Sequence, residues 1–133
     1  MAGASSAPAG QPWYDVDQGL LDRRIYADPE IYAEELEKIF ARAWNFVCHE
    51  TQIPEPGDFF MNWIGEDEVI VVRDRTGQIQ VLLNSCAHRG NTVCRAEQGN
   101  ASSFLCSYHG WNFDLTGKLV GMPGEEEYLS LIH

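Results

Sequence analysis

Basic residues are scarce in this chain of 133 residues. Nine Lys and Arg stand against twenty Asp and Glu, which gives a formal net charge of −11. Nucleic acids and anionic membranes attract positive charge, so this balance argues against either as a partner. Long apolar runs are also missing, since none approaches the roughly 18 residues of a membrane span. Residues 1–10 lack the charged-then-apolar order of a signal peptide. We therefore expect a cytoplasmic protein with no nucleic-acid or membrane partner.

Cysteine and histidine are also few, with four of each. In the absence of a signal peptide, the cysteines are expected in a reducing compartment, where metal ligation is more common than a disulfide framework. The length allows one domain, or one domain with an extension. Residues 1–12 are rich in Ala, Gly, Ser and Pro. They are expected to form a disordered tail because they carry little to bury.

An amphipathic helix is predicted over residues 28–44. Asp28 is a suitable N-cap, and Pro29 fits the first helical position, where its missing N–H costs nothing. Glu34 and Lys38 form an i,i+4 pair in the favourable order. Apolar residues recur at helical spacing on one face: Tyr32, Leu36, Ile39, Phe40, Ala43 and Trp44. We expect this face to dock on a neighbouring surface.

Short β-type runs replace the helical pattern after Trp44. Six are predicted as strands: 59–64, 69–73, 79–83, 103–106, 111–113 and 118–120. Turn-like segments separate several of them: 65–68, 74–77 and 114–117. Strands of this length and spacing predict a small antiparallel sandwich or barrel. The expected fold is mainly β, with a helical preamble over residues 13–45 and a β domain over residues 46–133.

Two segments each pair one cysteine with one histidine. Cys86 and His88 have one residue between them, and Cys106 and His109 have two. Such mixed pairs suit a [2Fe–2S] cluster in which two Cys bind one iron and two His bind the other. A Cys₂His₂ zinc site also takes four such ligands, although zinc motifs usually pair Cys with Cys and His with His.

Glycine and the remaining cysteines complete this pattern. Gly90 and Gly110 follow the two pairs. They would let the loop backbone approach closely and aim N–H groups at the cluster sulfides. Cys48 and His49 are adjacent but have no second pair at a suitable distance. Cys48 and Cys94 are therefore expected to be small core residues.

The two segments carry a resemblance. Cys86-Ala87-His88-Arg89-Gly90 and Cys106-Ser107-Tyr108-His109-Gly110-Trp111 resemble the cluster-binding motifs of the Rieske [2Fe–2S] domain in alpha subunits of bacterial ring-hydroxylating oxygenases. Residues 13–47 resemble the helical preamble of those subunits, and residues 53–59 resemble the entry to their Rieske domain. Ala87 departs from the family pattern, in which Arg is common. This change alters no ligand but could affect how the loop packs or meets a partner.

The resemblance implies a ligand set and partners. Two residues, Cys86 and Cys106, would bind one iron of a single [2Fe–2S] cluster, and two others, His88 and His109, would bind the second. The residues around the cluster would be Arg89, Gly90, Tyr108, Gly110 and Trp111, with the Trp111 ring shielding one side from water. A ferredoxin or reductase would supply electrons. The cluster would pass them to a mononuclear Fe(II) in a catalytic domain. That domain would dihydroxylate an aromatic substrate, a class that includes polycyclic hydrocarbons. A small beta subunit would complete the oxygenase.

No site for that second iron can be read from this sequence. A mononuclear oxygenase iron takes two His and one carboxylate. Outside the four cluster ligands only His49 and His133 remain. We therefore predict no catalytic residues here and expect an N-terminal fragment, truncated near its C-terminal end, whose own chemistry is electron transfer. The alternative is a stand-alone Rieske ferredoxin. The long preamble and the abrupt end at His133 argue against this alternative.

The resemblance also implies a low reduction potential. Respiratory Rieske proteins carry a disulfide between the cluster loops and Ser and Tyr hydroxyls that donate to cluster sulfurs. Here Asn91 and Tyr108 stand at the cysteine positions, and Trp111 and Phe113 stand at the hydroxyl positions. Loss of donors to sulfur destabilises the reduced cluster. The potential is therefore expected near the bottom of the Rieske range of about −150 to +300 mV.

Overall fold

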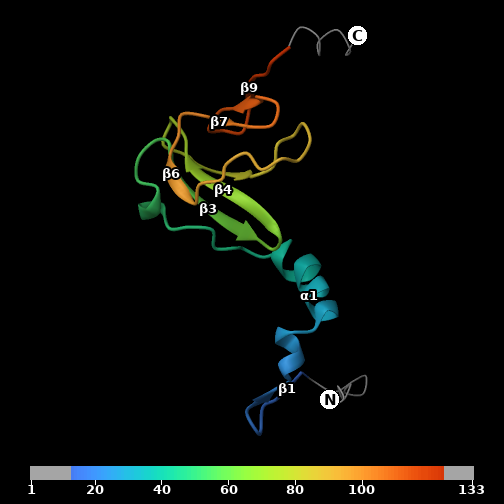
Figure 1. Ribbon diagram of the computed structural model, residues 1–133. Coiled ribbons are helices and arrows are strands. Elements are labelled where there is room, and N and C mark those ends of the chain that lie inside the picture. Colours follow the sequence, from blue (N-terminus) through green and yellow to red (C-terminus); the bar gives the residue numbers. More distant parts are fainter. Residues whose placement is uncertain (1–12, 125–133) are drawn as a thin grey trace. The chain divides into compact units, whose positions relative to one another are not determined.

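The structure is a computed structural model that describes residues 13–124. The predicted tail over residues 1–12, the predicted truncated end and His133 lie outside the described residues. The chain divides into two compact units, Met1–Ala43 and Trp44–His133. Several of their helices and strands are labelled in Figure 1. The predicted domain boundaries stay predictions.

The first unit begins with a short hairpin and continues as helix. The hairpin pairs β1 (Tyr14–Asp15) with β2 (Leu20–Leu21), and a 3-10 helix, η1 (Arg23–Tyr26), follows. The α-helix α1 then runs over Pro29–Glu35.

The predicted start of α1 is confirmed. The Asp28 side chain accepts a hydrogen bond from the Glu30 amide at 2.9 Å, and Pro29 occupies the first helical turn. Lys38 and Glu34 form the predicted ion pair at 2.6 Å. The cap satisfies an amide that the helix itself leaves without a carbonyl acceptor.

The predicted helix ends about one turn too late. After α1 the backbone widens into a single π-helical turn, η2 (Leu36–Phe40), in which the Ala41 amide donates to the Leu36 carbonyl at 3.1 Å. A turn follows, and the exposed fraction of Trp44 is 103%. Apolar spacing extends a helix only while its hydrogen bonds keep one register, and the π turn changes that register. Docking of the apolar face stays a prediction.

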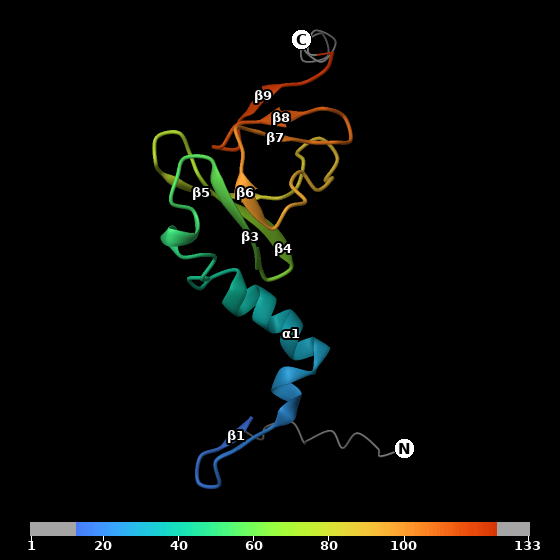
Figure 2. The same cartoon turned by 60° about the vertical axis from the view of Figure 1, so that its left-hand side comes forward.

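The second unit contains two antiparallel sheets, which Figure 2 separates most clearly. The larger has the order β5-β4-β3-β6, with β3 (Asp58–Ile64), β4 (Asp67–Arg73), β5 (Ile79–Leu83) and β6 (Gln98–Asn100). The smaller has the order β7-β8-β9, with β7 (Phe104–Leu105), β8 (Asn112–Phe113) and β9 (Leu119–Gly121). A 3-10 helix, η3 (Glu50–Gln52), precedes them. The six predicted strands are confirmed to within two residues, whereas β6 was not predicted.

The sequence Asp-x-Thr-Gly forms the same turn in both sheets. Asp74 Oδ1 accepts bonds from the Thr76 amide, the Thr76 hydroxyl and the Gln78 amide, at 2.8, 2.6 and 3.0 Å. Asp114 makes the same three bonds, to the amide and hydroxyl of Thr116 and the amide of Lys118, at the same distances. These carboxylates fix the β4–β5 and β8–β9 hairpins.

Alternating residues of β4 enter two different cores. Ile70 and Val72 join one cluster with Phe59, Phe104 and Leu115, so this cluster contains residues from both sheets. The intervening residues, Val69 and Val71, join a second cluster with Ile53. Because side chains alternate across a strand, β4 is buried on both faces. The predicted mainly β, antiparallel fold is confirmed.

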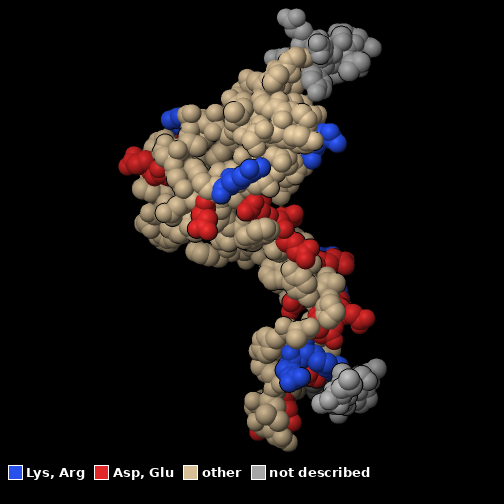
Figure 3. Space-filling model, in the orientation of Figure 1, with Lys and Arg blue, Asp and Glu red and all other residues tan. Residues whose placement is uncertain are grey.

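No helix within residues 13–124 combines the length and the apolar character that crossing a bilayer requires. Figure 3 shows one face of the molecule, on which most of the second unit is uncharged and acidic and basic side chains occur in small groups.

Candidate metal centre

Each Cys–His pair lies on a loop between strands. Cys86 and His88 follow β5, and Cys106 and His109 lie in the connection that joins β7 to β8. The loop after β5 and the connection from β7 to β8 lie side by side at one side of the second unit (Figure 2).

The two loops have the same pattern of backbone hydrogen bonds. In the first, the Cys86 amide donates to the Asn91 carbonyl at 2.8 Å, and the Gly90 amide donates to the Cys86 carbonyl at 2.7 Å. In the second, the Cys106 amide donates to the Trp111 carbonyl at 2.8 Å, and the Gly110 amide donates to the Cys106 carbonyl at 3.0 Å. Both glycines have left-handed φ angles, +71° and +72°. Glycine adopts this conformation at little cost, which explains its place at the end of each loop.

The loops place like donors together. The Cys86 side chain lies close enough to the Cys106 thiol to lower the pKa of that thiol. The ring centroids of His88 and His109 are 4.6 Å apart. One pair of sulfurs and one pair of imidazoles therefore face each other across the two loops. Within residues 13–124, no three Cys, His, Asp or Glu side chains converge on one point. A [2Fe–2S] cluster with two Cys on one iron and two His on the other uses this pairing of like donors.

Burial separates the two kinds of donor. Cys86 and Cys106 are 3% and 1% exposed, whereas His88 and His109 are half-buried. The Nδ1 atom of His88 is nevertheless buried, so this nitrogen points into the protein. The imidazole pair therefore lies nearer the surface than the sulfur pair.

Local hydrogen bonds favour the ionised form of Cys106. Burial by itself would raise the pKa of this thiol. The amides of Tyr108 and His109, the Cys86 side chain and the Asn91 amide together hold the pKa of Cys106 below its ordinary value. The Gly90 and Gly110 amides themselves donate to the cysteine carbonyls, and the expected aim of the loop N–H groups at the cluster sulfides stays a prediction. The amides that reach sulfur belong to Tyr108 and His109.

Aromatic side chains surround the imidazoles. The Trp111 ring stacks on His88, with centroids 4.9 Å apart and an interplanar angle of 11°. The Tyr108 ring lies 3.8 Å from His109, and the Arg89 guanidinium lies 5.9 Å from the centre of the Tyr108 ring. All five predicted surrounding residues therefore lie in these two loops or against their imidazoles.

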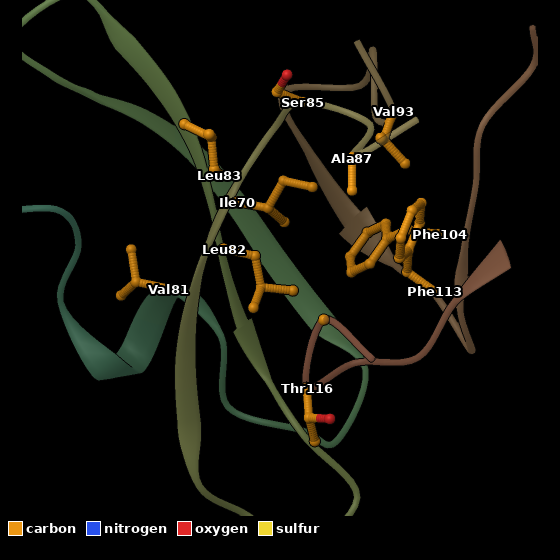
Figure 4. Close-up of a pocket in the computed structure, with 11 residues that line it drawn as sticks. Ile70, Val81, Leu82, Leu83, Ser85, Ala87, Val93, Phe104, Phe113 and Thr116 are labelled. Atoms are coloured by element: carbon orange, nitrogen blue, oxygen red, sulfur yellow. The ribbon is translucent and has the colours of Figure 1, made fainter. Parts of the chain in front are cut away.

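An apolar cavity of about 330 Å³ lies beside the first loop. Its walls include Ile70, Leu82, Ala87, Val93, Phe104 and Phe113, shown in Figure 4. The small Ala87 side chain therefore belongs to this cavity wall.

The described cysteines and histidine outside the two pairs, Cys48, Cys94 and His49, have other roles. Cys48 packs against the core around Ile53, and Cys94 packs against the core around Phe59, as predicted. Burial raises the pKa of the Cys48 thiol. His49 caps η3, with its Nδ1 atom 3.0 Å from the Thr51 hydroxyl.

Asn91 was not among the residues predicted to surround the cluster. The Asn91 side-chain amide donates across the loops to the Cys106 sulfur, with an N···S distance of 3.6 Å. Asn91 and Cys106 are far apart in sequence, so spacing within either motif carries no signal for this contact.

The donors, their pairing and the amides directed at sulfur fit a [2Fe–2S] cluster. Residues 43–131 match the family described as the Rieske [2Fe–2S] domain. The chain belongs to this family.

The chain is similar to part of several oxygenase alpha subunits. It is 53% identical to the biphenyl 2,3-dioxygenase alpha subunit of Rhodococcus jostii, over 86% of this chain and 27% of that subunit. It is 48% identical to a benzene 1,2-dioxygenase alpha subunit of Pseudomonas putida, over 90% of this chain and 27% of that subunit. Its structure is similar to naphthalene 1,2-dioxygenase from Rhodococcus sp. bound to indole, with a TM-score of 0.77, 48% identity, and coverage of 84% and 25%. The chain thus spans about a quarter of the length of these relatives.

Proposed function

We propose that this chain is the electron-transfer part of an aromatic-ring-hydroxylating dioxygenase alpha subunit. Cys86 and Cys106 would hold one iron of a [2Fe–2S] cluster, and His88 and His109 would hold the other. The observation that carries the proposal is the separation of a buried sulfur pair from an imidazole pair whose rings are 4.6 Å apart.

The protein's own groups suit this role. When bound, the cluster stores and releases one electron at a time. The amides of Tyr108 and His109 donate to the Cys106 sulfur and stabilise its negative charge. The His88 Nδ1 atom is buried and so directed inward, as a ligand nitrogen must be. The Trp111 ring covers one face of His88 and keeps water from it.

The imidazole side is the proposed route for electrons. Tyr108 is 58% exposed and its ring lies 3.8 Å from His109, so the histidines are linked to the surface by an aromatic contact. A ferredoxin or reductase would deliver electrons to the cluster. The acceptor would be a mononuclear Fe(II) in the catalytic domain of the full subunit, which works with a small beta subunit on an aromatic hydrocarbon.

A stand-alone Rieske ferredoxin is the second candidate, but the relatives speak against it. The alpha subunits at 48–53% identity match 86–90% of this chain, which is more than the cluster domain alone. We also propose a cytoplasmic location, supported by four cysteines that form no disulfide.

Metal analysis of the 133-residue chain tests the cluster. We expect two irons and two acid-labile sulfides per chain. Cys86→Ser and Cys106→Ser should each abolish the visible absorbance, and His88→Ala should abolish or destabilise it. Cys48→Ser, Cys94→Ser and His49→Ala are the matched controls and should retain full iron content. One zinc ion with no labile sulfide would overturn the proposal.

Turnover of the same chain tests whether it transfers electrons without hydroxylating a substrate. With a competent reductase, NADH, oxygen and naphthalene, the cluster should be reduced and reoxidised repeatedly. No cis-dihydrodiol should form, because residues 13–124 contain no group of three ligands that could hold a mononuclear iron. Product analysis by chromatography measures this directly. Diol formation by this chain would show that it contains an unrecognised iron site.

A further inference from the structure

We propose that Asn91 is a positioning residue that couples the two ligand loops and raises the reduction potential of the cluster. The inference rests on the proposed function, since it concerns the same sulfur and imidazole pairs. Its observation is separate: a side chain from the first loop donates to the ligand sulfur of the second, Nδ2 to Cys106 Sγ, at 3.6 Å.

Asn91 is held by both loops. Its backbone carbonyl accepts from the Cys86 amide at 2.8 Å and so closes the first loop. Its side-chain nitrogen donates to the Thr92 carbonyl at 2.8 Å as well as to the Cys106 sulfur. An amide nitrogen carries two hydrogens, which suffice for these two acceptors.

The chemistry fixes the orientation of this amide. If its oxygen and nitrogen were exchanged, the oxygen would face a carbonyl and a thiolate, which are both acceptors. The nitrogen therefore faces sulfur. The other donors to Cys106 differ in kind, since the Tyr108 and His109 amides belong to the backbone of the same loop. Among the described residues, Asn91 supplies the side-chain amide that reaches this sulfur from the opposite loop.

A donor to a ligand sulfur favours the reduced cluster. Reduction adds one negative charge, part of which resides on sulfur, and an N–H group stabilises that charge. Removing the donor should therefore lower the potential. Because this N···S contact is long and one of several, we expect the ratio of reduced to oxidised cluster at a fixed potential to fall about threefold, or about 30 mV at about 59 mV per tenfold change for one electron.

Protein-film voltammetry of three variants of the 133-residue chain tests this. Asn91→Leu keeps the approximate size and removes the donor. Asn91→Asp keeps the shape and replaces the donor with a carboxylate, so its potential should be lower than that of Asn91→Leu. Thr92→Val is the matched control in the same loop, because its side chain makes no hydrogen bond to either sulfur in the described structure. Its potential should equal that of the unmodified chain.

The outcomes separate this inference from the proposed function. An unmodified chain without iron and sulfide would refute the cluster itself. An unmodified chain with an intact cluster, together with an Asn91→Leu potential that does not change, would overturn the role of Asn91 alone. A faster loss of cluster from Asn91→Leu at an unchanged potential would also overturn it, because that result describes a purely structural residue.

A measurement on the unmodified chain covers the case in which Asn91→Leu does not assemble a cluster. With asparagine labelled with ¹⁵N at its side-chain nitrogen, pulsed EPR of the reduced chain should show a ¹⁵N hyperfine coupling. Thr92→Val should retain this coupling. Its absence from the unmodified chain would refute the Asn91–sulfur contact.

Discussion

Replacing the glycine at the end of each ligand loop should have unequal effects, although the two glycines have nearly the same conformation. Gly90 and Gly110 have φ angles of +71° and +72°. An alanine in this region costs about 1–2 kcal/mol, from the contact between its Cβ and the backbone. Alanine also reduces the conformational entropy of the unfolded chain, and this effect offsets about 0.4–1 kcal/mol of the cost. Gly90→Ala should therefore destabilise the loop by about 1 kcal/mol.

The surroundings differ for Gly110. A Cβ at Gly90 has only Ser85 Oγ nearby, at 3.8 Å, whereas a Cβ at Gly110 lies 3.0 Å from Pro123 Cγ and 3.4 Å from Pro123 Cδ. The proline ring must move or the loop must shift, and overpacking of this kind costs about 1–3 kcal/mol. At about 1.4 kcal/mol per tenfold, Gly110→Ala should lose its cluster roughly five- to a hundredfold faster than Gly90→Ala.

The assay is the decay of visible absorbance in a fixed concentration of urea, which reports opening of the ligand loops. A double variant identifies the cause. In a Pro123→Ala background the ring atoms are gone, so the added cost of Gly110→Ala should fall to that of Gly90→Ala. Equal decay rates for the two single variants, or an unchanged penalty in the Pro123→Ala background, would refute the steric argument.

Two further predictions follow from the described contacts. Hydrogen bonds from Thr76 and Gln80 lower the pKa of Asp74 to about 2 from 3.8. Its contribution to stability is therefore complete above about pH 4 and is lost as the pH falls towards 2. In urea titrations from pH 7 to pH 2, the free energy of unfolding of Asp74→Asn should fall less with acid than that of the unmodified chain. An equal fall would contradict this. Trp111→Ala should shorten the cluster lifetime in air several-fold, because the ring stacks on His88. Trp63→Ala, at a residue 57% exposed on β3, should not, and equal lifetimes would show that Trp111 is an ordinary packing residue.

The hairpins and the donor pairs could be predicted because their signals are local. Asp74-Arg75-Thr76-Gly77 contains the carboxylate, hydroxyl and glycine that its turn uses. The Cys–His pairs could be found because each lies within one short loop. The strand β6 could not, since Gln98-Gly99-Asn100 is exposed throughout and has no apolar alternation. This strand depends on the tertiary structure: a Cβ at Gly99 would lie 3.1 Å from the Phe59 ring, so the missing side chain lets β6 pair with β3.

Contacts between loops were also beyond prediction. Asn91 reaches Cys106 only after both loops have folded, and neither motif encodes the distance between them. The acceptors of the glycine amides could not be read from the sequence for a related reason. Spacing shows that a glycine follows each pair, but whether its N–H meets sulfur or a carbonyl depends on the closure of the loop. The Cys86 and Cys106 carbonyls accept these amides because each loop closes on its own cysteine.

The repeated Asp-x-Thr-Gly turn bears on the order in which the protein matures. Each turn is closed by contacts within a few residues, and β-hairpins of this kind form in roughly 1–10 μs. The β4–β5 and β8–β9 hairpins can therefore reach their register in a newly made chain before any iron is delivered. The ligand loops lie outside both turns, and cluster binding would add to their stability. A cluster-assembly system would thus meet a chain in which both hairpins are already formed.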